Sequence, residues 1–293
     1  MRITEKQIMA SLNRGIAQGW SRLGEIQERI SSGVRVEKPS DDPLASARIG
    51  SIDRALGELE RCELAAREGR AGLEASEGAL AEMSDLLIRA RELAVQGASD
   101  QYSAEDRHAM ALEVEKLREQ ALALANTQVG GRYIFSGALE DTPAFDAAGN
   151  YQGDGLEREL EVAPGLKVAV RLRGDILFGG AGGGVNIFTV LSDLQAALSA
   201  NDGAAVRSQL SLLEQAGEQI SQGRARAGSR LNLISGAHNW NGQLALQLQQ
   251  DRSSWRDTDL ASASLDLALA QKALEASVLS ASRMLQMNFL NRF

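Results

Sequence analysis

A seven-residue repeat in the C-terminal half constrains the fold of this chain more than any other feature of its sequence. The row runs without a slip through Val206, Leu213, Ile220, Ala227, Ile234, Asn241, Leu248 and Trp255. Every seventh residue returns to nearly the same face of an α-helix, so this row predicts a long helix that packs against another helix as a coiled coil. Asn241 is the polar member of the row. It either pins the register of the helix pair or is a polar defect in its seam.

The composition agrees with long helices packed side by side. The chain has 293 residues, of which 44% are hydrophobic and only 4% are aromatic. Large compact cores usually contain more aromatic residues, because those rings supply much of the buried area. The net charge of −8 argues against a nucleic-acid partner, because phosphates attract basic surfaces. We therefore expect a mainly helical protein that does not bind nucleic acid.

Signals for membrane insertion and for a cleaved leader are missing from the sequence. The stretch MRITEKQIMASLNRG lacks the apolar core of a secretory signal, and no run of eighteen apolar residues occurs anywhere. We expect no cleaved signal peptide and no membrane insertion. These signals do not report on export routes that use no cleaved leader.

The sequence also lacks the residue constellations of an enzyme. Cys62 is the only cysteine, so an internal disulfide is impossible, and we expect a buried, inert thiol. The two histidines, His108 and His238, lie on predicted helices without a partner at motif spacing. We expect His108 to be a solvated helix residue and His238 to flank the coiled coil. No catalytic residue, cofactor site or metal site is predicted.

The N-terminal region predicts a helix that stops and a second helix that starts. Large apolar residues recur at steps of mostly three and four between residues 3 and 30, which indicates one stripe on a helix. In the connector SSGVRVEKPSDDPLAS, Gly33 suits a left-handed helix end, Asp42 suits an N-cap and Pro43 suits the first helical position. The adjacent carboxylates Asp41 and Asp42 therefore serve as a helix-start device. An acid–base pair or a metal site is disfavoured, because no histidine or third carboxylate accompanies them.

The next segments predict two helices. One runs from Pro43 to about Gln96, and the other begins at a capping-box-like pair, Ser103 and Asp106, and ends near Gln128. The stretch VGGRYIF then changes to a strand pattern.

Alternation in LERELEV and LKVAVRL predicts a β-hairpin with Ala163-Pro164-Gly165 as its loop. In this register Glu161 faces Lys167 and Glu157 faces Arg171, and the apolar faces of the two strands coincide. The glycine-rich run FGGAGGGVN fits no phosphate-binding spacing and predicts a flexible return linker.

The fold that follows is mainly α with a small β insert: a long antiparallel helical coiled-coil core from the N- and C-terminal segments, and a β-rich middle domain. We divide the chain into an N-terminal assembly helix and connector at 1–42, the N-terminal half of the helical core at 43–130, a small β-rich domain at 131–186, the C-terminal half of the core at 187–256 and a C-terminal assembly helix at 257–293.

The terminal helices cannot be stable alone, because ordering their backbone costs more free energy than one apolar stripe returns. We expect the two helices to pair and to leave apolar surface for other subunits. The expected assembly interface comprises Ile8, Leu12, Ile16, Leu23, Ile26, Leu274, Val278, Leu285, Phe289 and Phe293.

Three stretches resemble the flagellin family. SSGVRVEKPSDDPLASARIGSID resembles its N-terminal signature, RARAGSRLNLI resembles its C-terminal core motif, and GRYIFSG followed by TPAF resembles the branch of the family at the hook–filament junction. The ending MLQMNFLNRF departs from the usual flagellin ending. The motif residues are Ser32, Gly33, Arg35, Pro39, Asp41, Asp42 and Pro43 in the first stretch, and Gly131, Arg132, Tyr133, Ile134 and Phe135 in the last.

The resemblance implies a structural adaptor of the bacterial flagellum that joins the hook side to the flagellin filament. It implies self-association in a ring, contact with the first hook-associated junction protein and with flagellin, and a cytoplasmic flagellar export chaperone. It also implies secretion through the flagellar type III apparatus to the extracellular flagellum, without a cleaved signal. The alternatives are a filament flagellin with a short variable domain and an intracellular coiled-coil adaptor or signalling protein. The latter would explain the heptads but not the β insert.

Overall fold

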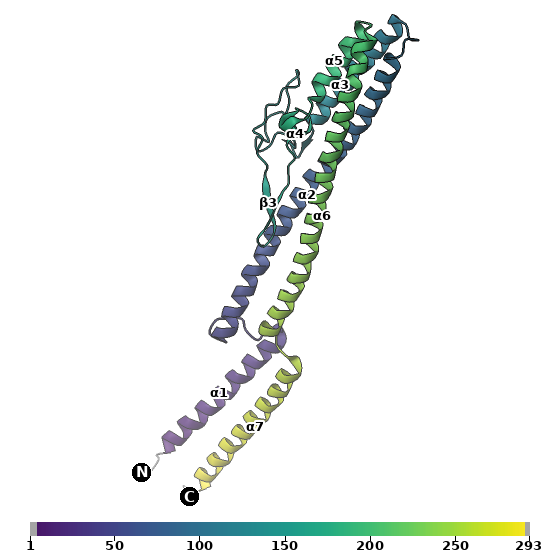
Figure 1. The fold of residues 1–293 in the computed structure, drawn as a ribbon. Helices are drawn as coiled ribbons and strands as arrows, with labels where there is room; N and C mark the ends of the chain where they lie inside the picture. The colour runs from purple at the N-terminus through teal and green to yellow at the C-terminus, as the bar shows by residue number, and fades with distance from the viewer. Residues whose placement is uncertain (1–4, 291–293) are drawn as a thin grey trace. The chain divides into compact units, whose positions relative to one another are not determined.

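Six long helices dominate the structure (Figure 1). The computed structural model describes the backbone of residues 5–290 and the side chains of residues 7, 9–284 and 286. The long helices are α1 (Glu5–Ser32), α2 (Pro43–Gly97), α3 (Ala104–Ala125), α5 (Ile187–Ser199), α6 (Gly203–Arg256) and α7 (Leu260–Leu290). The shorter elements are β1 (Gln128–Val129), β2 (Arg132–Tyr133), β3 (Glu159–Ala163), β4 (Leu166–Ala169), α4 (Gly174–Leu177) and η1 (Ala181–Gly183). The predicted mainly helical fold with a small β insert is confirmed.

The chain divides into two compact units, one formed by residues 58–244 and the other by residues 1–57 with 245–293. Helices α2 and α6 contribute to both units. The finer division into five functional parts stays a prediction.

Within residues 58–244, α2 and α6 pack side by side and run antiparallel. Gly69 lies against Ile234 and Gly97 against Val206, so the contacts advance along one helix as they recede along the other. The predicted row on α6 is buried from Val206 through Asn241. On α2 two rows with the same spacing are buried. They are Leu59, Ala66, Leu73, Leu80, Leu87 and Ala94, and Cys62, Gly69, Ser76, Met83, Ala90 and Gly97.

The helix ends follow from local hydrogen bonds. The Ser103 hydroxyl accepts a bond from the Asp106 amide, and the Asp106 carboxylate accepts one from the Ser103 amide, so the predicted capping box is confirmed. Helix α3 ends at Ala125, a few residues before the predicted end. The reason is Asn126, whose side chain bonds both the amide and the carbonyl of Phe145 and leaves the helical path.

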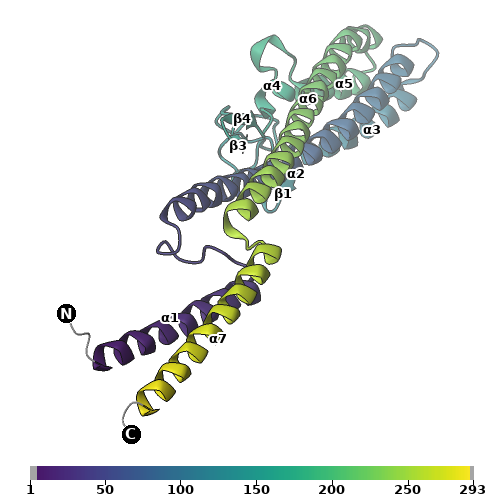
Figure 2. The same cartoon turned by 90° about the horizontal axis from the view of Figure 1, so that it is seen from below.

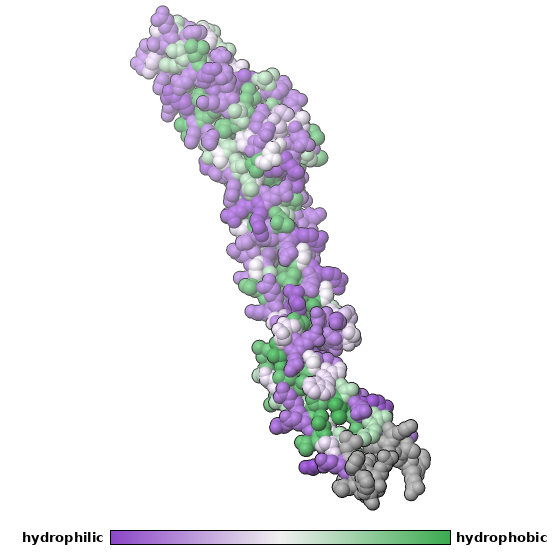
Figure 3. All heavy atoms as spheres, turned by 180° about the vertical axis from the view of Figure 1, so that it is seen from behind, coloured by the Kyte–Doolittle hydropathy of each residue, from purple (hydrophilic) through white to green (hydrophobic). Residues whose placement is uncertain are grey.

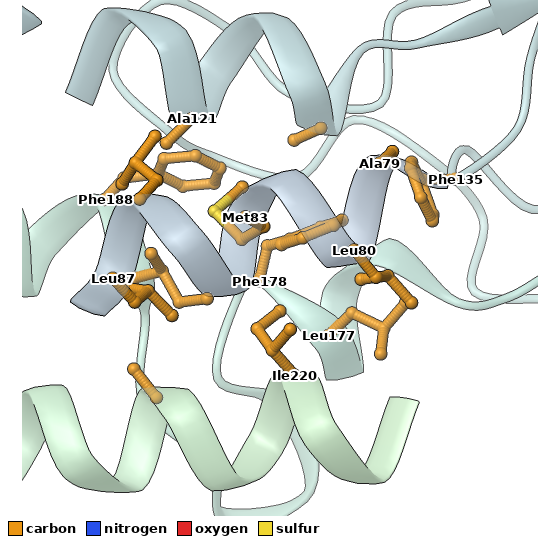
Figure 4. Packing of buried hydrophobic residues seen from close by; sticks show 14 of the residues in the cluster. Ala79, Leu80, Met83, Leu87, Ala121, Phe135, Leu177, Phe178, Phe188 and Ile220 are labelled. Atoms are coloured by element: carbon orange, nitrogen blue, oxygen red, sulfur yellow. The ribbon is translucent and has the colours of Figure 1, made fainter. Parts of the chain in front are cut away.

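An aromatic cluster forms the middle of the core in this unit. Phe178 meets Phe135 edge to face at a centroid distance of 5.0 Å and meets Phe145 at 5.9 Å. Phe188 lies 4.9 Å from Phe145. Figure 4 shows Phe135, Phe178 and Phe188 around Met83 of α2, with Ile220 of α6 on the other side. Four of the six phenylalanines of the chain therefore lie where the insert meets the helices.

The hairpin β3–β4 has the predicted register. Glu161 pairs with Lys167 and Glu159 pairs with Ala169. The predicted three-residue loop is wrong by one residue, because Ala163 pairs with Leu166 across a bulge and leaves Pro164-Gly165 as the turn. Gly165 takes a φ of +77°, which a side chain would disfavour.

The expected pairing of Glu157 with Arg171 does not occur. The ladder ends at Glu159, and the two side chains find other partners. Both carboxylate oxygens of Glu157 accept hydrogen bonds from Arg230 of α6 at 2.9 Å. Arg171 donates to Glu140 at 3.2 Å.

The glycine-rich run after Phe178 is not the flexible linker that its composition predicts. Its backbone contains η1, and Gly179 bridges to Asn186. The side chain of Gln219 on α6 accepts a bond from the Val185 amide at 3.0 Å and donates to the carbonyl of Leu177 at 2.8 Å. One glutamine from a distant helix therefore holds both ends of the run.

In the unit formed by residues 1–57 and 245–293, α1 and α7 lie side by side and run in opposite directions (Figure 1 and Figure 2). The predicted pairing of the N- and C-terminal helices is confirmed.

Candidate assembly surfaces

One face of α1 forms the seam of the terminal helix pair. Its positions alternate in steps of three and four, and each is buried or half-buried: Met9, Leu12, Ile16, Gly19, Leu23, Ile26 and Ile30. Gly19 lies on this face, and a Cβ built there would come within 2.9 Å of Leu274 Cδ1 on α7. The face of α7 that meets it contains Ala263, Leu267, Ala270, Leu274, Ser277 and Ala281. The spacing on both helices is that of a coiled coil.

The predicted interface residues fall into three groups. Leu12, Ile16, Leu23, Ile26 and Leu274 lie on the seam between the protein's own helices, with Leu23 and Ile26 buried. Val278 is exposed. The side chains of Ile8, Leu285 and Phe289 and all of Phe293 lie outside the described part of the structure. Contact of any of these residues with another subunit stays a prediction.

A second apolar row lies on the opposite side of α7. Leu265, Leu269 and Leu279 are 65%, 61% and 55% exposed. We call these three residues the outer row. Figure 3 shows hydrophobic side chains gathered over the terminal helix pair, beside the grey terminal residues. A helix that is apolar on more than one side is normally buried in a larger assembly.

Sequence reasoning missed the outer row because it followed the seven-residue spacing of Leu260, Leu267 and Leu274. The available signal was the i, i+4 pair of Leu265 and Leu269, with a further leucine, Leu279, two heptads after Leu265.

The connector between α1 and α2 uses its carboxylates to hold backbone. Asp41 Oδ2 accepts bonds from the amides of Lys38 and Glu37, and these bonds lower the pKa of Asp41. Asp42 Oδ1 accepts the Ala45 amide at 3.0 Å, which, with a bond from Arg35, lowers the pKa of Asp42. The predicted roles of Asp42 as N-cap and of the following proline as first residue of α2 are confirmed.

Arg35 ties the connector to the end of α6. Its guanidinium donates to the Trp255 carbonyl at 2.7 Å and to Asp42 Oδ2 at 3.1 Å, and its amide donates to the Arg256 carbonyl at 2.7 Å. Gly33 takes the predicted left-handed conformation with φ +69°, and its carbonyl accepts a bond from the Thr258 amide. The connector that follows α1 and the link between α6 and α7 are therefore hydrogen-bonded to each other.

The remaining motif residues of the connector are simpler. The hydroxyl of Ser32 accepts a bond from the Val34 amide at 3.2 Å. Pro39 is exposed and lies in the turn before α2.

Asp42→Ala is expected to lower the melting temperature of the full-length protein by a few degrees. The substitution removes the cap of α2 and the anionic partner of Arg35. Thermal melting followed by circular dichroism measures this, with the exposed neighbour Ser40→Ala as the matched control. A loss of export or motility without a change in melting would instead make the connector a recognition element.

The motif GRYIF builds the core rather than a ligand site. Gly130 and Gly131 both take positive φ in the turn between β1 and β2. Ile134 and Phe135 are fully buried, and the Phe135 carbonyl accepts bonds from the Gly174 amide and the Tyr151 hydroxyl. Tyr133, at the end of β2, is half-buried. The motif therefore joins the insert to the helices.

Glu140 lies among three arginines. It contacts Arg132 at 3.1 Å, Arg158 at 2.9 Å and the buried Arg171 at 3.2 Å. Burial alone would raise the pKa of Glu140, but the hydrogen bonds and charges of Arg158 and Arg171 together lower it. Arg171 follows the hairpin in the chain, and its guanidinium lies against Gly72 of α2. The network around Glu140 therefore holds the hairpin against this helix.

Glu140→Gln is expected to lower the free energy of unfolding by about 1–3 kcal/mol at neutral pH, since three arginines lose their shared anion. The pKa of Glu140 is lower in the folded protein, so its contribution is full above the ordinary value of 4.5 and is lost as the pH falls through the folded-state pKa. Denaturant unfolding at pH 7 and near pH 3 should therefore show a difference that shrinks in acid. Glu74→Gln, in an exposed ion pair with Arg70, is the control. An undiminished difference in acid would contradict the electrostatic account.

No arrangement typical of an active site is present in the described residues. His108 is exposed, and His238 lies at the coiled-coil flank with Nδ1 2.9 Å from Glu63, as predicted. Cys62 is buried, and this burial raises the pKa of its thiol. A shallow groove of about 810 Å³ beside α6 has an uncharged lining that includes Leu166, Leu233 and Trp240. Within residues 5–290, no cluster of histidine, cysteine and carboxylate groups could hold a metal ion.

Among the described helices, none combines the length and the apolar character that a bilayer crossing requires.

Residues 3–140 match the family model of the bacterial flagellin N-terminal helical region. The N-terminal part of the chain is therefore similar to the flagellin family. It is 26% identical to flagellar hook-associated protein 3 of Escherichia coli (strain K12), over 94% of this chain and 95% of that protein. It is 27% identical to the flagellar filament 30.7 kDa core protein of Treponema maltophilum, over 86% of this chain and 84% of that protein.

Solved structures show the same fold. FlgL of Xanthomonas campestris matches with a TM-score of 0.63 at 22% identity and covers 69% of this chain and 99% of its own. The flagellar junction protein FlgL of Legionella pneumophila matches with a TM-score of 0.59 at 20% identity and covers 71% of this chain and 99% of its own.

Proposed function

We propose that this protein is a structural adaptor of the bacterial flagellum that joins the hook side to the flagellin filament. The observation that carries the proposal is the likeness to hook-associated protein 3, which extends over nearly the full length of both chains. The likeness therefore includes the terminal helices as well as the insert.

The terminal helices are the parts that assemble. Helices α1 and α7 form a pair that leaves Leu265, Leu269 and Leu279 exposed. Burial of such leucines against neighbouring subunits removes apolar surface from water and stabilises a polymer. The partners are further copies of this chain in a ring, the first hook-associated junction protein on one side and flagellin on the other.

The exposed outer row also bears on export. A chain with this surface needs a cover before it assembles, which is the task of a cytoplasmic export chaperone. Export through the flagellar apparatus without a cleaved signal delivers the protein to the extracellular junction. The role is mechanical and not enzymatic. The family consists of structural flagellar proteins, and the described histidines and carboxylates have structural partners or face solvent.

A filament flagellin with a short variable domain is the second candidate. The Treponema maltophilum filament core protein, at 27% identity, favours it. The two functions differ in the phenotype of a strain that lacks this gene. Loss of a filament subunit that polymerises with other flagellins gives shorter, altered or absent filaments. Loss of an adaptor gives flagellin that is exported but stays outside the cell as monomer.

Electron microscopy of a deletion strain tests the proposal. We expect hooks without filaments, monomeric flagellin in the medium, and restoration of filaments by the wild-type gene supplied in trans. Hooks without filaments and with no flagellin in the medium would favour the filament-subunit function.

A further inference from the structure

The heptads of α2 and α6 leave the register of the helix pair open. Apolar residues recur every seven residues on α2 from Leu59 to Ala94 and on α6 from Val206 to Ile234. A pair that slides by one heptad still places apolar rows against each other. Side-chain size favours the native register to some extent, because Gly69 lies opposite Ile234 and a slip would place a larger residue opposite this isoleucine.

The β3–β4 hairpin sits on α2 at one place. Val170, just after β4, packs against Gly69 so closely that a Cβ on this glycine would collide with it. The guanidinium of Arg171 passes over Gly72 in the same way. Both positions lie inside a helix, where glycine is unfavourable by roughly 1 kcal/mol relative to alanine. The two glycines therefore form a fitted seat for the hairpin.

The same hairpin is bonded to α6 at two places. Asn241 Nδ2 donates to the Val162 carbonyl of β3 at 2.8 Å, and the amide group is buried. Arg230 donates to the Arg171 carbonyl at 2.7 Å and to both Glu157 oxygens at 2.9 Å. Asn241 thus bonds to the insert, and its other polar atom, Oδ1, has no partner among the described residues.

We propose that the β3–β4 hairpin is a register lock for α2 and α6. A slip of one heptad displaces one helix by about 10 Å along the other. The hairpin is short, with four paired positions, and cannot keep its seat on α2 and its bonds to α6 after such a displacement. Buried asparagines fix register in coiled coils by bonding to each other. Here the asparagine fixes register through a third element that touches both helices.

Crosslinking of the full-length protein tests the lock. In a Cys62→Ala background, Glu63→Cys with His238→Cys reports the native register, because these side chains are in contact. Glu63→Cys with Leu231→Cys and Arg70→Cys with His238→Cys report a one-heptad slip in either direction. A short bis-maleimide crosslinker should join only the native pair in the parent protein.

The unlocked protein carries Asn241→Leu and Arg230→Ala. We expect both slipped pairs, or one of them, to react about tenfold faster than in the parent, as the loss of several modest hydrogen bonds implies. Arg224→Ala is the matched control, since it removes an ion pair between α6 and Glu77 of α2 without touching the hairpin.

Asn241→Leu alone provides a second, milder variant, because leucine continues the apolar row. Circular dichroism melting establishes that each variant is folded. A folded variant in which the slipped pairs stay as unreactive as in the parent would overturn the proposal and assign register to side-chain size. A slip in Arg224→Ala as large as in the unlocked protein would overturn it as well.

Discussion

Leu269→Asp is expected to abolish filament growth and to leave the melting of the purified protein unchanged. Leu269 is in the outer row of α7 and is 61% exposed, so the new carboxylate stays hydrated in the monomer. In an assembly that covers the outer row, the same carboxylate loses its water without gaining a partner, which costs several kcal/mol. Cells with this variant should have bare hooks and should release flagellin. Filaments per cell, flagellin in the medium and the melting curve are the three readouts.

Two matched variants separate assembly from folding. Ile26→Asp places a carboxylate in the seam between α1 and α7, where the residue is buried, so it should reduce the helical signal of the monomer. Gln271→Asp places the same charge on an exposed polar position of α7 and should leave both filaments and melting unaffected. Normal filaments in the Leu269→Asp strain would show that the outer row is not an assembly surface.

Phe178→Ala is expected to lower the free energy of unfolding by about 3–5 kcal/mol. The ring is fully buried and stacks edge to face against Phe135 and Phe145, so its removal leaves a cavity that the rigid helices cannot close. Denaturant unfolding measures the change. Leu156→Ala, at an exposed position of the same insert, is the control and should change stability by less than about 0.5 kcal/mol.

An effect of Phe178→Ala as small as that of Leu156→Ala would mean that the insert folds separately from the helices. The structure argues against this, because Val162, Val168, Val170 and Phe178 belong to the same core cluster as Leu73 and Leu80 of α2.

The sequence could predict the features that depend on near neighbours in the chain. The helical rows follow from spacing, the end of α1 from Gly33, the start of α2 from Asp42 and the hairpin register from alternation. In each case the interacting residues lie within a few positions of each other, so their chemistry and spacing determine the local structure.

The features that could not be predicted depend on residues far apart in sequence. Gln219 holds the glycine-rich run from 34 positions away, and Asn241 finds its acceptor in β3. Arg107 is buried and donates to the carbonyls of Gly97 and Ser99 at the end of α2 and to Asn201. No local pattern marks these three side chains as partners of a distant backbone.

The candidate site was predicted in part for the same reason. The pairing of α1 with α7 followed from the stripe on α1, but the stripe alone could not show how much of it α7 covers. Leu23 and Ile26 turned out to be buried within the monomer, and the exposed leucines lie on the other side of α7. The glycines at 69 and 72 were a visible signal of close packing, but their sequence does not name the hairpin as the occupant.

Immunogold electron microscopy of intact flagella tests the adaptor function most directly. A small epitope replaces the exposed turn Pro164-Gly165 of the hairpin, and gold particles then report where the protein sits along the flagellum. We expect one narrow band of gold between hook and filament, at a position that does not change as the filament grows. Gold distributed along the whole filament would contradict the adaptor function and make this protein a filament subunit.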